Sequence, residues 1–389
     1  MNKRNLDIEV LRAVAILGTL IVHVDILLFW GSDRLSAFSH VFSPWGGVDL
    51  FFCISGYVIT GNLLRSLDQS RPSSFSELAF PFWIKRVWRI FPSAWLWATV
   101  MLVLSIAFSR EGHFGTPTAN LIDAAAVISQ VANFRIWSCF AIPGTLCGGN
   151  VVYWSLSLEE QSYMLLPLLL FFCGRRIVVY ALAAAVLAQL FLHRPLLSFL
   201  WFFRTDALAL GALIAIAKSS GVLAKIEPRW LSNGWRSAIA LALLCALLAA
   251  IPAAFVSIPF HTGLLAITSA AMIWIASYAR GYTLPDGLIK RAAVYIGARS
   301  YAIYLIHIPV YLVTREIWSR IEGNGAAIDG HFTVRFIVTA TVLILVLAEL
   351  NFRLIEQPLR RYGVSLANKW ESKRARAVST ASTQNIATP

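Results

Sequence analysis

The chain has 389 residues, of which 58% are hydrophobic and only 14% are charged, whereas roughly a quarter of the residues in a soluble domain are charged. This surplus of apolar residues is more than one soluble core needs, which excludes an ordinary soluble protein. The formal net charge of +13 does not indicate a nucleic-acid partner, because the basic residues lie between apolar stretches and form no stripe with interleaved aromatic residues.

Apolar stretches near the length that crosses a bilayer, about 20 residues, recur along almost the whole chain. We expect an all-α, polytopic integral membrane helix bundle of about ten transmembrane helices. The predicted spans are 9–29, 46–65, 92–109, 150–172, 177–192, 197–217, 236–252, 262–279, 296–318 and 333–355.

The first span follows a basic start, as a secretory signal does, but it contains His23 and Asp25 and no small-residue cleavage site follows it. We therefore expect a retained first helix. The aromatic and basic sequence PFWIKRVWRIF predicts an interfacial helix before the third span. The transmembrane domain is expected to cover residues 1–361. Residues 362–389 are charged and then rich in Ser, Thr and Ala, which predicts a cytoplasmic, disordered tail.

Lysine and arginine fall mostly on one side of the predicted spans. By the positive-inside rule, this distribution places both termini in the cytoplasm. Cys139 and Cys147 then share a loop on the outer side. They are either two free thiols or a disulfide, and the outer location somewhat favours the disulfide.

Arg12 and His23 lie on one face of the first span, three turns and roughly 16 Å apart along the helix axis. The second span enters from outside, so Asp49 reaches about the depth of His23. We expect these two side chains to pair. A carboxylate fixes the imidazole tautomer, so that the neutral ring can take a proton from a hydroxyl. The alternative is that His23 only hydrogen-bonds across helices.

Ionisable side chains inside a bilayer cost at least ~2.5–3.5 kcal/mol each, and the later spans contain several. Glu159 and Glu160 interrupt an apolar helix, and at least one of them is expected to have a task. Arg204 and Asp206 in the sixth span are expected to form a structural ion pair with one another. For His307 in the ninth span, a structural and a functional role both stay open.

Arg86 and Arg89 lie one helical turn apart beside the third span. With Arg12 at similar depth, they predict a cationic cluster suited to phosphate groups. The alternative for each arginine alone is an ordinary basic flank of a membrane span.

Seven segments of the sequence, in this order, resemble the acyltransferase family 3 membrane proteins, which acylate sugars and other surface or secreted molecules. The segments are LDIEVLRAVAILGTLIVHV, GGVDLFFCISGYVIT, KRVWRIFP, YWSLSLEEQSYMLLP, FFRTDALALGALIA, GARSYAIYLIHIP and ELNFRLIEQPLRR. The resemblance implies an acyl-CoA donor that enters from the cytoplasm and transfer to a hydroxyl at the opposite face. It also implies that His23 is the catalytic base, that Arg12, Arg86 and Arg89 bind the donor, and that the Glu159 region completes the site.

We therefore expect an O-acyltransferase in the bacterial cytoplasmic membrane, with acetyl-CoA or another acyl-CoA as donor and no metal. The acceptor is expected to be a saccharide or glycolipid, chosen by the bundle and its outer loops, especially 110–150. The reaction can run by direct attack or through a covalent acyl intermediate. Direct attack is favoured because no Ser or Cys is clearly poised beside His23, although Ser55 stays open as a nucleophile. The catalytic candidates are His23, Asp49 and Glu159, and the candidate substrate-binding residues are Ser55, Tyr163, Arg204, Asp206 and His307.

The alternative function is a proton-coupled transporter or flippase of a polysaccharide precursor, in which the same His and carboxylates relay protons. Inverted-repeat transporters show matching interrupted helices in their two halves, and this sequence shows none.

Overall fold

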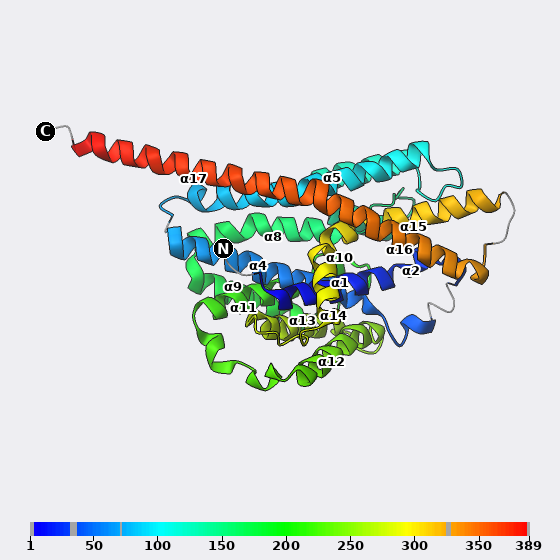
Figure 1. The fold of residues 1–389 in the computed structure, drawn as a ribbon, viewed down its shortest axis with the longest axis horizontal. Helices are drawn as coiled ribbons and strands as arrows, with labels where there is room; N and C mark the ends of the chain where they lie inside the picture. Colours follow the sequence, from blue (N-terminus) through cyan, green and yellow to red (C-terminus); the bar gives the residue numbers. More distant parts are fainter. Residues whose placement is uncertain (1–3, 32–36, 71, 324–327, 387–389) are drawn as a thin grey trace.

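The computed structural model describes residues 4–31, 37–70, 72–323 and 328–386, and the regular elements in these ranges are all helical. Most helices run along the long axis of the molecule, and α14 crosses them steeply (Figure 1). The longer helices are α1 (Leu6–Val22), α4 (Gly47–Ser70), α5 (Phe75–Ala107), α8 (Tyr153–Phe172), α9 (Gly174–Leu190), α11 (Asp206–Ser219), α12 (Gly234–Ala253), α13 (His261–Ser277), α15 (Ser300–Glu322), α16 (Thr333–Asn351) and α17 (Gln357–Ile386). Shorter helices are α2 (Val24–Leu27), α6 (Pro117–Ile128), α7 (Ala132–Ala141), α10 (Phe199–Phe202) and α14 (Leu288–Ala298).

Several helices are long and apolar enough to cross a membrane, which confirms the predicted all-helical, multi-pass architecture. Within the described ranges, the five candidates are Pro44–Ser70, Phe75–Ala107, Phe199–Ser219, Gly234–Ala253 and Gly330–Arg374, and the pair α14 and α15, bent by 72°, makes a sixth. The predicted count of about ten spans is not confirmed by this criterion. The first predicted span is divided, because α1 ends at Val22 and α2 begins at Val24, with His23 at the junction.

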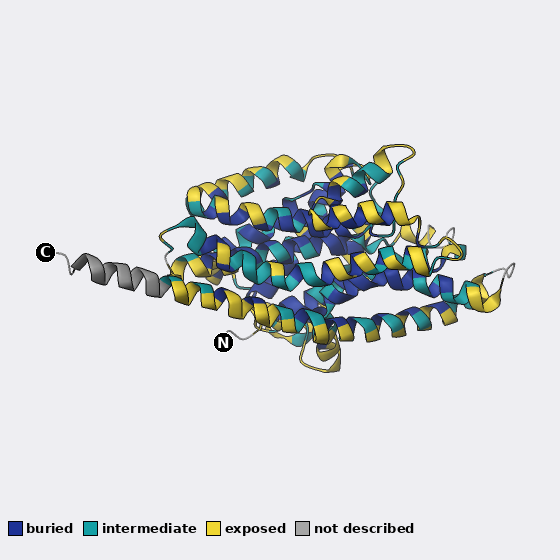
Figure 2. Cartoon of the chain, turned by 90° about the horizontal axis from the view of Figure 1, so that it is seen from above, coloured by how far each residue is buried: buried dark blue, intermediate teal, exposed yellow. Residues whose placement is uncertain are grey.

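Small residues allow the central helices to approach closely. A Cβ added at Gly56 of α4 would lie 2.0 Å from the carbonyl oxygen of Leu208, and one added at Gly211 of α11 would lie 2.1 Å from that of Cys53. Close approach through small residues is how membrane helices gain packing energy without a hydrophobic driving force. In Figure 2 the buried residues lie in the interior and the exposed ones on the outside of the bundle.

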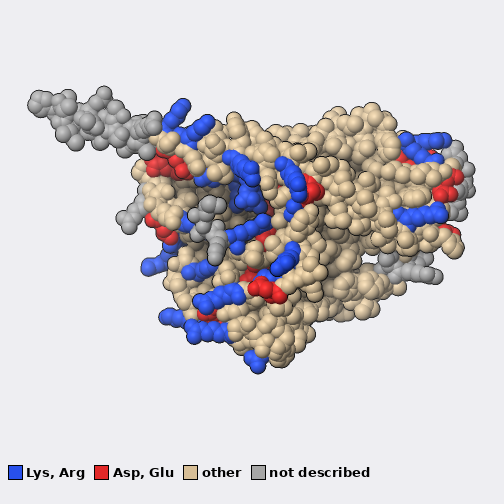
Figure 3. Space-filling model, in the orientation of Figure 1, with Lys and Arg blue, Asp and Glu red and all other residues tan. Residues whose placement is uncertain are grey.

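Positive charge gathers at one end of the molecule, which we call the basic end. Figure 3 shows Lys and Arg concentrated toward the left, where α1 begins and α17 ends. A smaller group of cations lies at the opposite end beside acidic side chains. Cys139 in the last turns of α7 is joined by a disulfide to Cys147 in the loop that follows, with their Cα atoms 5.8 Å apart. Of the two alternatives that the sequence left open, free thiols or a disulfide, the structure has the disulfide.

The C-terminal segment is helical beyond residue 361, the boundary that the sequence predicts for the transmembrane domain. After a π-helical turn, η6 (Phe352–Glu356), α17 continues to Ile386, and residues 387–389 lie outside the described ranges. Trp370 stacks on Phe80 of α5 with the ring centroids 5.9 Å apart, and Arg374 pairs with Glu77 at 3.2 Å. These contacts pack the part of α17 up to Arg374 against α5. The predicted interfacial helix is likewise the first part of α5, continuous with the third span.

Candidate functional site

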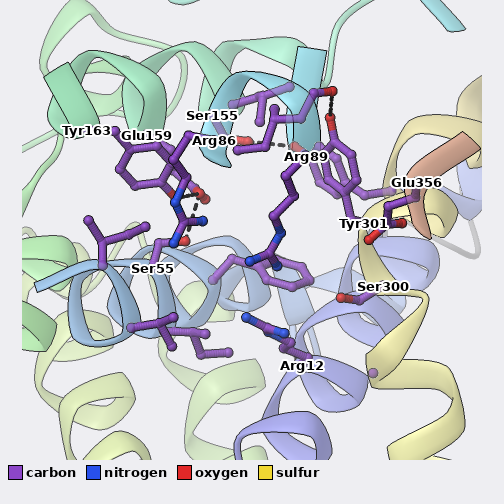
Figure 4. Close-up of a pocket in the computed structure, with 18 of the residues that line it drawn as sticks. Arg12, Ser55, Arg86, Arg89, Ser155, Glu159, Tyr163, Ser300, Tyr301 and Glu356 are labelled. Carbon is purple, nitrogen blue, oxygen red and sulfur yellow. Dashed lines mark hydrogen bonds between the residues drawn. The ribbon is translucent and has the colours of Figure 1, made fainter. Parts of the chain in front are cut away.

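A buried cavity of about 100 Å³ lies where α1, α4, α5, α8, α15 and η6 meet. The polar residues of its lining are Arg12, Ser55, Arg86, Arg89, Ser155, Glu159, Tyr163, Ser300, Tyr301, Tyr304 and Glu356. Figure 4 shows the Arg12 and Arg89 side chains extending into the space between a group around Glu159 and a group around Glu356. The site therefore draws its side chains from segments that are far apart in the sequence.

Two larger cavities, of about 810 and 860 Å³, adjoin this one at the basic end, and we call them together the vestibule. Arg65, Arg89 and Arg360 line both of them, and Arg89 also lines the buried cavity. Arg89 thus marks the point where the three spaces meet. The vestibule is wide enough for a large polar ligand, and the buried cavity admits only a narrow one.

The cavity arginines are poorly matched by carboxylates. Arg12 pairs with Glu9 at 3.2 Å, and Arg86 lies over the ring of Tyr163, 5.3 Å from its centroid. No carboxylate of the described residues lies within 4.0 Å of the guanidinium nitrogens of Arg86 or Arg89. Half-buried guanidinium groups that share one cavity without carboxylate partners repel one another, so this arrangement favours an anionic ligand.

Glu159 is the centre of a second polar group in the cavity. Its Oε2 accepts hydrogen bonds from the Ser55 hydroxyl at 2.7 Å and from the Tyr163 hydroxyl at 2.6 Å. Tyr163 is one helical turn after Glu159 on α8, and Ser55 comes from α4. The structure therefore brings together three of the predicted site residues, next to the predicted Arg86.

His23 pairs with a histidine and not with an aspartate. His23 Nδ1 lies 3.1 Å from Nε2 of His307 on α15, and Nδ1 of His307 lies 2.7 Å from the carbonyl oxygen of Tyr304. The predicted His23–Asp49 pair is wrong, because Arg204 donates to both carboxylate oxygens of Asp49, at 2.8 and 3.0 Å. Helix rise gave Asp49 a plausible depth, but depth does not say which way the side chain points around its helix.

The predicted Arg204–Asp206 pair is also wrong. Arg204 bonds Asp49, and Asp206 instead pairs with Arg194 at 2.5 Å, and all four side chains are almost wholly buried. The Arg204 guanidinium lies 4.3 Å from the ring centroid of Trp201, and a desolvated cation in such a place requires a carboxylate. None of these four side chains lines the buried cavity, so the structure does not bring Asp49, Arg204 or Asp206 to it. His23 and His307 are not part of the cavity lining either, and His307 is connected to it through Tyr304.

Sequence reasoning missed several cavity residues. Tyr304 lines the cavity, and its hydroxyl lies 2.7 Å from the Ser155 hydroxyl while its carbonyl oxygen contacts His307. This tyrosine therefore stands between the cavity and the histidine pair. Glu356 reaches the cavity from the π-helical turn, and such turns often occur at functional sites. The available signal was that Tyr304 lies in GARSYAIYLIHIP and Glu356 in ELNFRLIEQPLRR, two of the segments on which the sequence resemblance rests.

Comparison with known proteins identifies the family. Residues 5–350 match the family described as "Acyltransferase domain". The chain belongs to this family. Among its relatives, the peptidoglycan O-acetyltransferase OatA of Listeria monocytogenes is 26% identical over 92% of this chain and 56% of its own length. The O-acetyltransferase OatA of Staphylococcus aureus strain NCTC 8325 is 26% identical over 91% of this chain and 57% of its own.

The chain thus spans little more than half the length of these acyltransferase relatives. No solved structure matches it. Within the described residues, no group of three or more His, Cys, Asp or Glu side chains could hold a metal ion. The family match ends before Glu356 and α17, so part of the vestibule wall lies outside the matched region.

Proposed function

We propose that this chain is a membrane O-acyltransferase that moves an acyl group, acetyl in the first instance, from acyl-CoA to a hydroxyl of a saccharide or glycolipid. Family membership and the names of the relatives support acyl transfer, and peptidoglycan is the acceptor that the Listeria relative's name gives. The observation that carries the proposal is the cavity in which Arg86 and Arg89 have no carboxylate partner among the described residues.

The donor site proposed here uses the shape and charge of the three cavities. Acyl-CoA has a large, phosphate-bearing nucleotide end and a narrow pantetheine arm that ends in the thioester. The vestibule suits the nucleotide end, with Arg65, Arg89 and Arg360 as phosphate partners. Glu356 Oε2 is buried in the cavity lining with no hydrogen-bond partner among the described residues, and an amide N–H of the arm can satisfy it.

The proposed orientation of the protein in the membrane follows from the basic residues at the basic end. The positive-inside rule puts the basic end, with both chain termini, on the cytoplasmic side of the inner membrane, where acyl-CoA is available. The acceptor then approaches from the opposite end. Arg12 and His23 are on consecutive helical segments, roughly 16 Å apart along the axis, so the thioester arm has only part of the bilayer to cross before it reaches His23.

The proposed reaction is a direct transfer. The neutral His23 ring takes the proton of the acceptor hydroxyl as its oxygen attacks the thioester carbonyl carbon. The carbon–sulfur bond then breaks, the electron pair leaves with the CoA thiolate, and the proton held by His23 protonates that sulfur. The products are the ester and free CoA. Glu159 holds Ser55 and Tyr163 beside the path of the arm.

The test uses membranes that contain the protein, labelled acetyl-CoA and peptidoglycan fragments or a crude glycan extract as acceptor. His23→Ala is expected to lower transfer by about 10²–10⁴-fold, the usual contribution of a general base. The matched control is His193→Ala, because His193 is exposed on the loop before α10, and it should leave transfer unchanged. Equal labelling by wild type and His23→Ala would overturn the mechanism, and acceptor movement without labelling would support the transporter alternative.

A further inference from the structure

The histidine pair fixes its own protonation pattern. The Tyr304 carbonyl oxygen can only accept, so its 2.7 Å contact requires a hydrogen on Nδ1 of His307. A neutral His307 then has a bare Nε2, which can only accept. The 3.1 Å contact therefore takes its hydrogen from Nδ1 of His23. In a neutral His23 ring this leaves Nε2 unprotonated, which is the form that can act as a base.

The surroundings keep His307 neutral. Its side chain is 0% exposed, and no carboxylate of the described residues lies within 4.0 Å of either ring. A buried imidazolium without a paired anion is strongly disfavoured. Three other charged or titratable groups are near the pair: Asp25 of α2, and Tyr311 and Arg315 of α15. The Tyr311 hydroxyl donates to the main-chain oxygen of Leu20, and the Arg315 guanidinium donates to that of Ile26.

The His307 ring is also held in place. Its Nδ1 is fixed by the carbonyl one turn earlier on α15, and the rings of Tyr304 and Tyr311 lie 5.8 and 5.9 Å from it between centroids. Tyr311 further ties α15 to α1 through its 3.1 Å hydrogen bond to Leu20. His307 is therefore a rigid acceptor aimed at His23.

We propose that His307 is the positioning residue for the base of the acyl-transfer reaction: it accepts a hydrogen bond from Nδ1 of His23 and so presents an unprotonated Nε2 to the acceptor hydroxyl. This inference rests on the proposed function. It gives to a neutral histidine on α15 the task that a carboxylate performs in a Ser-His-Asp triad. Asp49 is not available for that task, because Arg204 occupies it.

The first test is spectroscopic and does not depend on activity. Protein labelled with ¹⁵N-histidine is reconstituted in lipid, and the His23 nitrogens are assigned by their loss in His23→Ala. We expect Nδ1 of His23 to be protonated and Nε2 bare at neutral pH. In His307→Leu, which offers no acceptor, this preference is lost. A wild-type His23 with its hydrogen on Nε2, or an unchanged tautomer in His307→Leu, would overturn the inference while leaving the proposed function standing.

The second test is kinetic. His307→Leu is expected to lower kcat by about 10²-fold or more, with the KM for acetyl-CoA unchanged, because the donor pocket is untouched. His307→Gln, whose amide oxygen can accept from His23, is expected to recover most of that loss. If Gln and Leu are equally damaging, or if the loss is all in KM, His307 has no positioning role.

The chain offers a matched control in His261. This histidine is also buried and its Nδ1 also contacts the carbonyl one turn earlier, that of Ile258 at 3.0 Å, but its Nε2 has no hydrogen-bond partner among the described residues. His261→Leu should leave the His23 tautomer and kcat unchanged. A loss of kcat in this control equal to that in His307→Leu would assign both effects to packing and contradict the inference.

Discussion

Two groups of arginines in this bundle differ in the partners they have. Beside α10 and α11, Arg204 and Arg194 are almost wholly buried and each meets an aspartate. At the basic end, Arg86 and Arg89 line a cavity with no carboxylate of the described residues in ion-pair range. We interpret a cation matched within the chain as structural, and we propose that the cations left unmatched around the cavity bind a ligand from outside.

The difference follows from the cost of taking charge out of water. A buried pair stays intact because removing one partner leaves an uncompensated charge. Arg86 and Arg89 carry the same charge but adjoin the vestibule, where water or an anion can reach them. Substitutions that break the Arg204 or Arg194 ion pairs should therefore lower the unfolding free energy. Substitutions of Arg86 or Arg89 should instead weaken donor binding.

The largest expected effect is on the structural pair. Asp49→Ala leaves Arg204 buried and unpaired, so we expect a loss of about 3–5 kcal/mol in unfolding free energy, measured by thermal unfolding in detergent. Asp68→Ala is the control, because its pair with Arg175 is exposed and should contribute no more than about 1 kcal/mol. If the Asp49→Ala protein folds with normal stability but loses catalysis, Asp49 has a catalytic role and its pair with Arg204 is not mainly structural.

An intermediate effect is expected at the meeting point of the cavities. Arg89→Gln should raise the apparent KM for acetyl-CoA by about 10–100-fold, the effect of losing a hydrogen bond to a charged group. Its unfolding temperature should be unchanged or higher, because no internal ion pair is lost. Arg335→Gln, which loses only an exposed pair with Glu322, is the control. An unchanged KM would mean that Arg89 is only a basic flank.

The smallest effect is expected at Ser55. Its hydroxyl donates to Glu159 at 2.7 Å, so Ser55→Ala should cost about 1 kcal/mol, which lowers kcat/KM by roughly fivefold. A covalent acyl-serine route predicts complete loss instead. Steady-state kinetics with purified protein distinguish the two, and a Ser55→Ala variant with no activity would refute direct attack.

Sequence reasoning succeeded where one-dimensional geometry suffices. Helix rise placed Arg12 at the depth of the arginines of α5, and all three line the cavity. Ser55, Glu159 and Tyr163, which the sequence singled out separately, lie in hydrogen-bond contact, while their roles stay predictions. These relations depend on depth in the membrane and on sequence pattern, both of which can be read from the chain.

It failed where the rotation of a helix or a distant partner decides the contact. Asp49 has a suitable depth for His23 but faces Arg204, and Asp206 meets an arginine twelve residues earlier that the sequence places in a loop. The partner of His23 is 284 residues away, and no spacing rule connects them.

We propose that an acyl group passes from the basic end of the bundle to an acceptor at the opposite end. Sided proteoliposomes test it most directly: labelled acetyl-CoA is supplied only to the side that exposes the basic end, and the glycan acceptor only to the other. We expect labelled acceptor with wild-type protein and none above background with His23→Ala. Labelling only when donor and acceptor share one side, or equal labelling by the two proteins, would contradict it.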